Sequence, residues 1–295
     1  MSENSAIEWT DHTFNPWIGC TKVSPACDNC YAADIAGRFG QAEWGPGKER
    51  PSTSETYWEQ PLKWQRAAKR FYAKHGRRQR VFCASMADVF DNEVDASRRR
   101  RLFDLIEQTP DLEWLLLTKR IGNVSKMALE MGYDDIPLPD NVWLGITVCN
   151  QEEADRDIPK LLEIPATLRF LSMEPLLGMV DLTEFLICER ARYGLSMDPT
   201  TGAYECCEDC DFTGLIGEIG WVITGGESGA KARLPDVERF RSLRDQCRDA
   251  TVPFFFKQWG TFNVDGQRVG KKVSGNELDG RTHLEFPSLD RKAPE

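Results

Sequence analysis

The 295-residue sequence lacks long apolar segments, internal repeats and low-complexity tracts. Its apolar runs fall short of the ~20 residues that a membrane-spanning helix needs, so we expect no membrane contact. Residues 1–14 contain no basic segment followed by an apolar one, which predicts no secretory signal and a cytoplasmic, reducing location. Histidine is also scarce, because only His12, His75 and His283 occur, at spacings that suit no metal site.

Positive charge is in deficit. The chain has 37 Lys and Arg residues against 47 Asp and Glu residues, which gives a net charge of −10. Overall charge therefore does not attract this protein to nucleic acid. Two basic clusters, residues 77–80 and 98–101, leave a local basic groove open, although the second flanks an apolar stripe and is typical of a solvated helix face.

Short apolar runs rich in branched and aromatic residues recur along the chain, as in strands buried on both faces of a parallel sheet. The expected strands are residues 80–87, 112–118, 142–148, 168–173, 221–224 and 253–257, with one more before Cys20. Helices are expected at 95–107, 151–164 and 235–250, the second broken at Pro159. About seven strands alternating with helices predict an α/β fold, a partial or irregular parallel (β/α) barrel.

The barrel domain is expected to span residues 1–262 and to carry a cysteine-rich insert at about 186–214. Residues 263–295 have the composition of an irregular, charged tail. Residues 39–56 are rich in Gly, Pro and Ser, which predicts a loop that could cover the mouth of the barrel.

Ten cysteines are present, and three of them lie within eleven residues at the spacing C-x6-C-x2-C: Cys20, Cys27 and Cys30. A structural zinc ion or an ordinary ferredoxin cluster takes four protein ligands. No fourth ligand is near, because His12 lies eight residues earlier and the next cysteine is Cys83. Three thiolates can bind three irons of a [4Fe–4S] cluster and leave the fourth iron open. The alternative is a zinc site that takes its fourth ligand from elsewhere.

A second group of four cysteines lies in the insert: Cys188, Cys206, Cys207 and Cys210. Their spacing is that of a compressed half of a zinc ribbon, and zinc would stabilise a segment too small for its own core. An auxiliary iron–sulfur cluster, free thiols and a disulfide remain open alternatives. The other three cysteines are expected to be small buried hydrophobic residues: Cys83, Cys149 and Cys247.

Seven motifs spread over residues 7–262 together carry a family resemblance. They are NPWIGC with SPACDNCYA, SMADVF (85–90), LLLTKR (115–120), LGITV (144–148), LSMEPLLG (171–178), WVITGGESG (221–229) and PFFFKQWG (253–260). This set resembles the phage Gp37/Gp68 family, a divergent branch related to radical SAM enzymes. Radical SAM proteins typically have C-x3-C-x2-C, whereas this chain lengthens the first gap and has Asn29 where an aromatic residue is usual.

The resemblance implies a radical SAM enzyme of the barrel type. Its open iron would bind the amino and carboxylate groups of S-adenosyl-L-methionine (SAM), and an electron donor would reduce the cluster. Cleavage of SAM would give a 5′-deoxyadenosyl radical that abstracts hydrogen from a substrate. The substrate implied is a nucleotide or a nucleic acid base, modified or repaired, with a partner protein as a further expectation. Two alternatives stay open: a non-catalytic zinc or iron–sulfur partner module, and a SAM-independent redox protein.

Polar residues follow the expected strands, and ligands bind at the carboxyl ends of strands in parallel α/β folds. We expect six residues to bind cofactor: Asp88, Arg120, Ser172, Glu174, Gly225 and Gly226. We expect three to be catalytic: Lys119, Glu227 and Lys257.

The resemblance suggests roles for these residues. Asp88 would bind the amino group of SAM, and Lys119 with Arg120 its carboxylate or a phosphate. Glu174 would bind a ribose or a substrate amide. Trp259 would offer a stacking surface for a nucleobase, with ordinary packing as the alternative. For residues 225–226 a tight strand–helix turn is the alternative.

Overall fold

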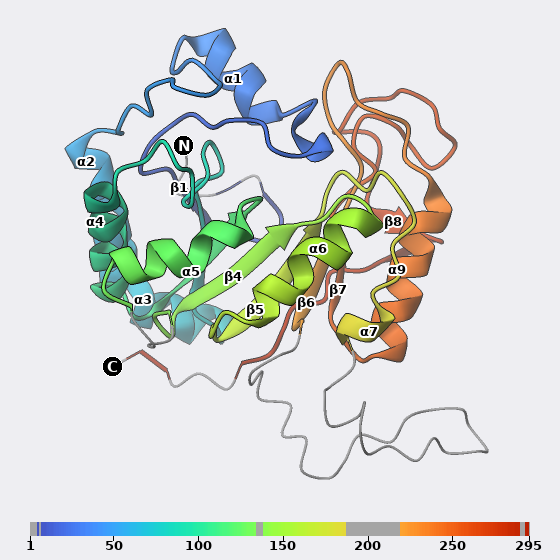
Figure 1. The fold of residues 1–295 in the computed structure, drawn as a ribbon. Helices are drawn as coiled ribbons and strands as arrows, with labels where there is room; N and C mark the ends of the chain where they lie inside the picture. Colours follow the sequence, from blue (N-terminus) through green and yellow to red (C-terminus); the bar gives the residue numbers. More distant parts are fainter. Residues whose placement is uncertain (1–4, 6, 134–137, 187–218, 290–292, 295) are drawn as a thin grey trace. The chain divides into compact units, whose positions relative to one another are not determined.

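The computed structural model describes residues 5, 7–133, 138–186, 219–289 and 293–294. The chain divides into two compact units: residues 1–147, 164–167 and 291–295 form the first, and residues 148–163 and 168–290 the second. Within each unit the strands follow one another in chain order, and the paired strands are parallel (Figure 1). The fold is therefore α/β and consistent with the predicted partial parallel barrel.

The first unit contains four parallel strands: β1 (His12–Phe14), β2 (Gln79–Cys83), β3 (Leu112–Thr118) and β4 (Val142–Thr147). Their registers align Phe14, Cys83, Leu116 and Leu144 in one row across the sheet, and all four side chains are fully buried. All residues of β2 and β4 are buried, so the sheet is covered on both faces, as the continuous apolar runs predicted.

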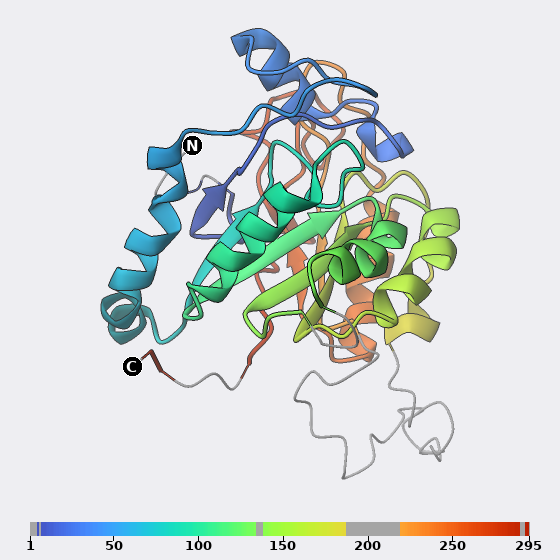
Figure 2. The same ribbon diagram turned by 60° about the vertical axis from the view of Figure 1, so that its left-hand side comes forward.

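The helices of the first unit are α1 (Tyr31–Phe39), α2 (Glu55–Trp58), α3 (Gln60–His75), α4 (Ala96–Glu107) and α5 (Ile121–Glu130), with a 3-10 turn at Pro25–Cys27. Glycines in the left-handed conformation end α1 at Gly40 and α3 at Gly76. Figure 2 turns this unit forward and shows α4 alongside the strands.

The second basic cluster, on α4, is a solvated helix face only in part. Arg99 is 1% exposed and donates a hydrogen bond to the carbonyl of Val94. Arg101 lies 4.1 Å from the ring centroid of Trp58, in a cation–π contact. The solvated-face prediction is therefore wrong for Arg99, which faces carbonyls of its own unit, whereas Arg101 remains exposed, with 47% of its side chain accessible.

The second unit contains the parallel strands β5 (Leu168–Met173), β6 (Trp221–Thr224) and β7 (Phe254–Phe256), with helices α6 (Gln151–Leu162), α7 (Thr183–Leu186) and α9 (Val237–Asp249). Register places Ser172 opposite Ile223 and Ile223 opposite Phe255. Two short antiparallel strands, β8 (Glu277–Leu278) and β9 (Arg281–Thr282), lie within the segment expected to be an irregular tail.

Pro159 does not break α6, contrary to expectation. The helix runs through it and ends three residues later, at Leu162. A proline removes one intrahelical hydrogen bond, and here a buried apolar stripe that includes Ala154, Ile158 and Leu161 holds the helix in place. The side chain of Asn150 caps its first turn by accepting a hydrogen bond from the backbone N–H of Glu153.

In the part of the chain that the structure describes, no helix has both the length and the apolar character needed to cross a membrane. The predicted cysteine-rich insert lies almost wholly within residues 187–218, outside the described residues.

Tyr57 fastens β1 to the chain that follows it. Its hydroxyl donates to the carbonyl of Thr13 at 3.0 Å and accepts the backbone N–H of Asn15 at 3.1 Å. Burial raises the pKa of Tyr57 to about 12, above the ~10 of an unperturbed tyrosine. Between pH ~10 and about 12, Tyr57 is ionised in the unfolded chain but not in the folded protein. The free energy of unfolding therefore falls as pH rises through this range.

Replacing Tyr57 with Phe should lower the free energy of unfolding at pH 7 by about 1–2 kcal/mol, because a buried N–H loses its acceptor. The difference in free energy of unfolding between variant and wild type should narrow above pH ~10. There, ionisation of Tyr57 stabilises the unfolded chain of the wild type, and the variant has no such group. Urea denaturation at pH 7 and above pH ~10 measures the free energy of unfolding of both proteins. Tyr72→Phe on α3 is the control, and a difference independent of pH would contradict this account of Tyr57.

Candidate functional site

The three-cysteine segment follows β1 and runs beside the chain that follows β2. The backbone N–H of Gly19 donates to the carbonyl of Met86 at 3.0 Å. Gly19 has φ +112, and a Cβ at this position would lie 3.0 Å from Cδ of Arg50. Glycine is therefore needed here on two grounds, backbone conformation and space.

All three thiols of this segment are free of disulfides. Cys27 is buried and ends the 3-10 turn, which Ser24 caps by accepting a hydrogen bond from the N–H of Ala26. Cys30 is half-buried and occupies the N-cap position of α1, so the helix starts directly after it. Cys20 is also half-buried.

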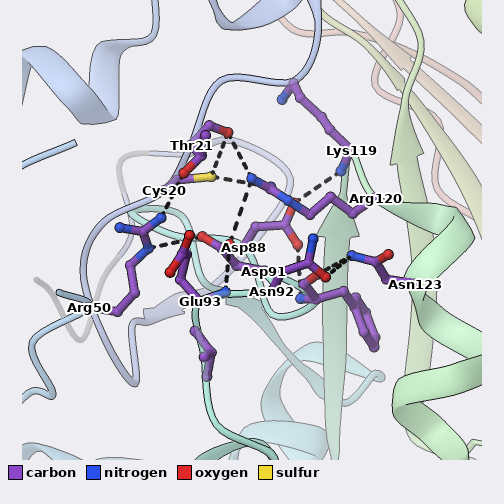
Figure 3. Close-up of polar contacts among 12 residues, drawn as sticks. Cys20, Thr21, Arg50, Asp88, Asp91, Asn92, Glu93, Lys119, Arg120 and Asn123 are labelled. Carbon is purple, nitrogen blue, oxygen red and sulfur yellow. Dashed lines mark hydrogen bonds and ion pairs between the residues drawn. The ribbon is translucent and has the colours of Figure 1, made fainter. Parts of the chain in front are cut away.

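Arg120 connects Cys20 to the carboxyl ends of β2 and β3 (Figure 3). Its Nη1 lies 3.3 Å from Sγ of Cys20 and 3.0 Å from Oδ2 of Asp88, and donates to both. Its Nη2 donates to the carbonyl of Thr21 at 2.8 Å. The structure thus brings together three predicted site residues from separate segments, Cys20, Asp88 and Arg120.

Both carboxylate oxygens of Asp88 are occupied. Oδ1 accepts hydrogen bonds from the hydroxyl of Thr118 at 2.8 Å and the N–H of Phe90 at 2.9 Å. Oδ2 accepts from the N–H of Lys119 at 3.2 Å as well as from Arg120. With four donors around it, Asp88 is built to hold the ends of β2 and β3 in place.

Arg50, which the sequence analysis did not single out, fixes the predicted loop 39–56 to the cysteine segment. Its side chain is fully buried, and its Nε donates to Oδ2 of Asp91 at 2.9 Å. Its Nη2 donates to the hydroxyl of Thr21 at 2.8 Å, and its Nη1 to the carbonyl of Lys48 at 2.7 Å. In the sequence, only the presence of an arginine in a Gly- and Pro-rich loop pointed to the ion pair of Arg50 and Asp91.

The environment of Cys20 favours the thiol over the thiolate. Burial and the charge of Asp88 raise the pKa of Cys20 to about 11, against the opposing effect of Arg120. Metal ligation requires the thiolate. A thiolate here is therefore stable at neutral pH only when a further positive charge, such as a metal ion, joins the site.

Lys119 stands apart from this network. Its side chain is half-buried and extends away from the Asp88–Arg120 pair (Figure 3). Among the described residues its Nζ has no hydrogen bond or ion pair. Asp88 and Arg120 are hydrogen-bonded to each other, whereas the ammonium group of Lys119 is available to bind a ligand.

In the second unit, the ends of all three strands meet around Glu174. Lys257, after β7, donates from Nζ to Oε2 of Glu174 at 2.9 Å. The other oxygen, Oε1, is buried and has no hydrogen-bond partner among the described residues. A Cβ at Gly225, after β6, would lie 2.8 Å from Oε1. Gly225 therefore leaves the space that this carboxylate occupies.

Gly226 has a packing role, as the tight-turn alternative predicted. A Cβ there would lie 1.9 Å from the carbonyl oxygen of Trp259. Trp259 is 2% exposed and packs edge-on against Phe240 and Phe256. Ordinary packing is therefore the role of Trp259, and it offers no stacking surface because the residue is buried.

Glu227 and Ser172 are both held inside the second unit. Glu227 accepts hydrogen bonds from the backbone N–H and from Nη2 of Arg233, both at 2.7 Å. Ser172 is 5% exposed within β5. A cavity of about 270 Å³ lies beside this region, and its lining includes Pro175, Gly225 and Glu227.

Comparison with known proteins places the chain in a family. The model of a family described as "Protein of unknown function (DUF5131)" matches residues 4–287. The chain belongs to this family. No curated protein and no solved structure matches the chain significantly.

In this DUF5131 protein, no three His, Cys, Asp or Glu side chains of the described residues converge as ligands of one metal ion. A [4Fe–4S] cluster places a different requirement on its ligands, because each thiolate binds a separate iron. The predicted zinc ligands Cys188, Cys206, Cys207 and Cys210 lie outside the described residues.

Replacing Lys257 with Met should lower the free energy of unfolding by about 2–4 kcal/mol, because the largely buried carboxylate of Glu174 loses its cation. The double variant K257M/E174Q should recover part of this loss, since the uncompensated charge is gone. Urea denaturation of both variants, with Lys271→Met as a surface control, measures the effect. Equal stability of the single and double variants would contradict the pairing.

Proposed function

We propose that this protein is a radical SAM-type iron–sulfur enzyme. Cys20, Cys27 and Cys30 would bind three irons of a [4Fe–4S] cluster, and the fourth iron would bind SAM. The observation that carries the proposal is a short segment of three free thiols, with Cys20 joined by Arg120 to the carboxyl ends of β2 and β3. Ligands bind at that end of the strands in parallel α/β folds.

The donor set suits this group. Three cysteines from one segment supply thiolates only, the ligand type of iron–sulfur clusters, and α1 starts directly after Cys30 with its backbone N–H groups directed toward its N-terminus. When bound and reduced, such a cluster supplies one electron for cleavage of the sulfonium of SAM. The resemblance of the sequence motifs to the phage Gp37/Gp68 family supports the same assignment.

The residues of the chain would orient and shield the reacting groups. In the first unit, Asp88, Arg120 and Arg50 hold the cysteine segment through buried hydrogen bonds. In the second unit, Oε1 of Glu174, which has no hydrogen-bond partner among the described residues, would accept a hydrogen bond from a hydroxyl, amide or amine of a ligand, with Lys257 holding the carboxylate in place. Lys119 would bind a carboxylate or phosphate.

A nucleotide or a single nucleic acid base is the proposed substrate. The net charge of −10 gives no general attraction to nucleic acid. Arginines of both basic clusters are engaged within the first unit, as Arg77 pairs with Asp11 at 2.6 Å and Arg99 is buried. These contacts favour a small or protein-delivered substrate over unaided binding of a duplex.

Anaerobic reconstitution of Cys27→Ala tests the proposal. Wild-type protein should bind about four irons per chain and, with a reductant, form 5′-deoxyadenosine from SAM. Cys27→Ala should lose the cluster absorbance and the product, because one of three ligands is gone. Cys247→Ala, a buried cysteine of α9, should keep both and serves as the matched control.

Two results would contradict the proposal. Stoichiometric zinc at Cys20, Cys27 and Cys30 without SAM cleavage would make the chain a non-catalytic metal module. A cluster that cycles between oxidation states without consuming SAM would make it a SAM-independent redox protein.

A further inference from the structure

Arg120 is placed as a hydrogen-bond donor to a cysteine sulfur rather than as a free cation. Its guanidinium is buried, with 7% of the side chain exposed. Nη1 lies 3.3 Å from Sγ of Cys20, a residue 100 positions away in the chain, and Nη2 donates to the carbonyl of the next residue, Thr21. Both terminal nitrogens therefore face the cysteine segment.

The guanidinium of Arg120 is fixed in its orientation by its neighbours. Asp88 accepts from Nη1 at 3.0 Å and is itself fixed by Thr118 and Phe90. Asp91 lies 3.9 Å from Nη2. A planar guanidinium held by acceptors along its edge has one orientation, so the N–H directed at Cys20 is pre-organised. Arg120 is thus poorly placed to bind the carboxylate of SAM, the role that the sequence suggested.

The charge of Arg120 is offset by its neighbours. Asp88 and Asp91 face Arg120 and Arg50 in buried contacts, and the buried Arg99 donates to the carbonyl of Asp91. At Cys20, Arg120 therefore adds a direct N–H···S contact to the charges of this group. A hydrogen bond in such a buried site is stronger than in water.

A donor to a coordinating sulfur stabilises the state with more negative charge. Reduction of a [4Fe–4S]²⁺ cluster adds one electron from an external one-electron donor and gives [4Fe–4S]⁺. Hydrogen bonds to the sulfurs are among the determinants of this potential. We propose that Arg120 is a positioning residue that raises the reduction potential of the cluster through its hydrogen bond to Cys20. This inference rests on the proposed function.

Arg120→Lys tests it by potentiometric titration of the reconstituted protein with dithionite, followed by the EPR signal of the reduced cluster. Lysine keeps the positive charge beside Asp88, but one ammonium group cannot reproduce the planar fork that reaches Cys20, Asp88 and Thr21. The equilibrium constant for reduction should fall about tenfold, which is about 59 mV for a one-electron couple.

Two controls separate this role from a merely structural one. Lys126→Met removes a positive charge from α5, where the exposed ammonium lies 3.9 Å from Glu130. Arg50→Lys disturbs the same network at Asp91 and at the side chain of Thr21, where it has no contact with the sulfur among the described residues. Both should change the equilibrium constant for reduction by less than about twofold.

The outcomes are distinguishable. A wild-type protein that assembles no four-iron cluster contradicts the proposed function and this inference together. A normal cluster with the same potential in wild type and Arg120→Lys overturns the inference alone. If Arg120→Lys assembles no cluster, resonance Raman spectra of the wild type in H₂O and D₂O decide: a shift of the iron–thiolate stretching bands supports an exchangeable N–H···S bond, and unchanged bands overturn it.

Discussion

The buried pair of Arg120 and Asp88 is the contact on which the arrangement of the first unit's site depends. Asp88 joins the ends of β2 and β3, and Arg120 extends from that junction to Cys20 and Thr21. Burying either charge alone would cost several kcal/mol. The two charges are therefore buried together as an ion pair. The remaining hydrogen bonds of Arg120 go to Cys20 and Thr21, and they hold the cysteine segment in place.

A second buried ion pair, between Arg50 and Asp91, attaches the loop that follows α1. A Gly- and Pro-rich segment of this composition has little core of its own to order it. Arg50 supplies the missing attachment, since it contacts Thr21, Asp91 and backbone carbonyls of its own loop. The loop is thereby fixed beside Cys20, whose carbonyl accepts the backbone N–H of Gly45 at 3.0 Å.

Local pattern was enough to predict the strands, because burial on both faces of a sheet leaves continuous apolar runs in the sequence. It was not enough for contacts between distant segments. Arg50 pairs with a residue 41 positions away and Arg120 contacts one 100 positions away, so no window of sequence contains both partners. The sequence could not decide between stacking and packing for Trp259 for the same reason, since the rings that it contacts include Phe240 on α9.

The central claim is that three cysteine ligands leave one iron of a four-iron cluster open to SAM. Mössbauer spectroscopy of protein reconstituted with ⁵⁷Fe, before and after addition of SAM, tests this most directly. The account predicts that one iron in four changes its isomer shift and quadrupole splitting when SAM is added, while three stay the same. Four irons that are all unaffected by SAM, or iron bound in no four-iron cluster, would contradict it.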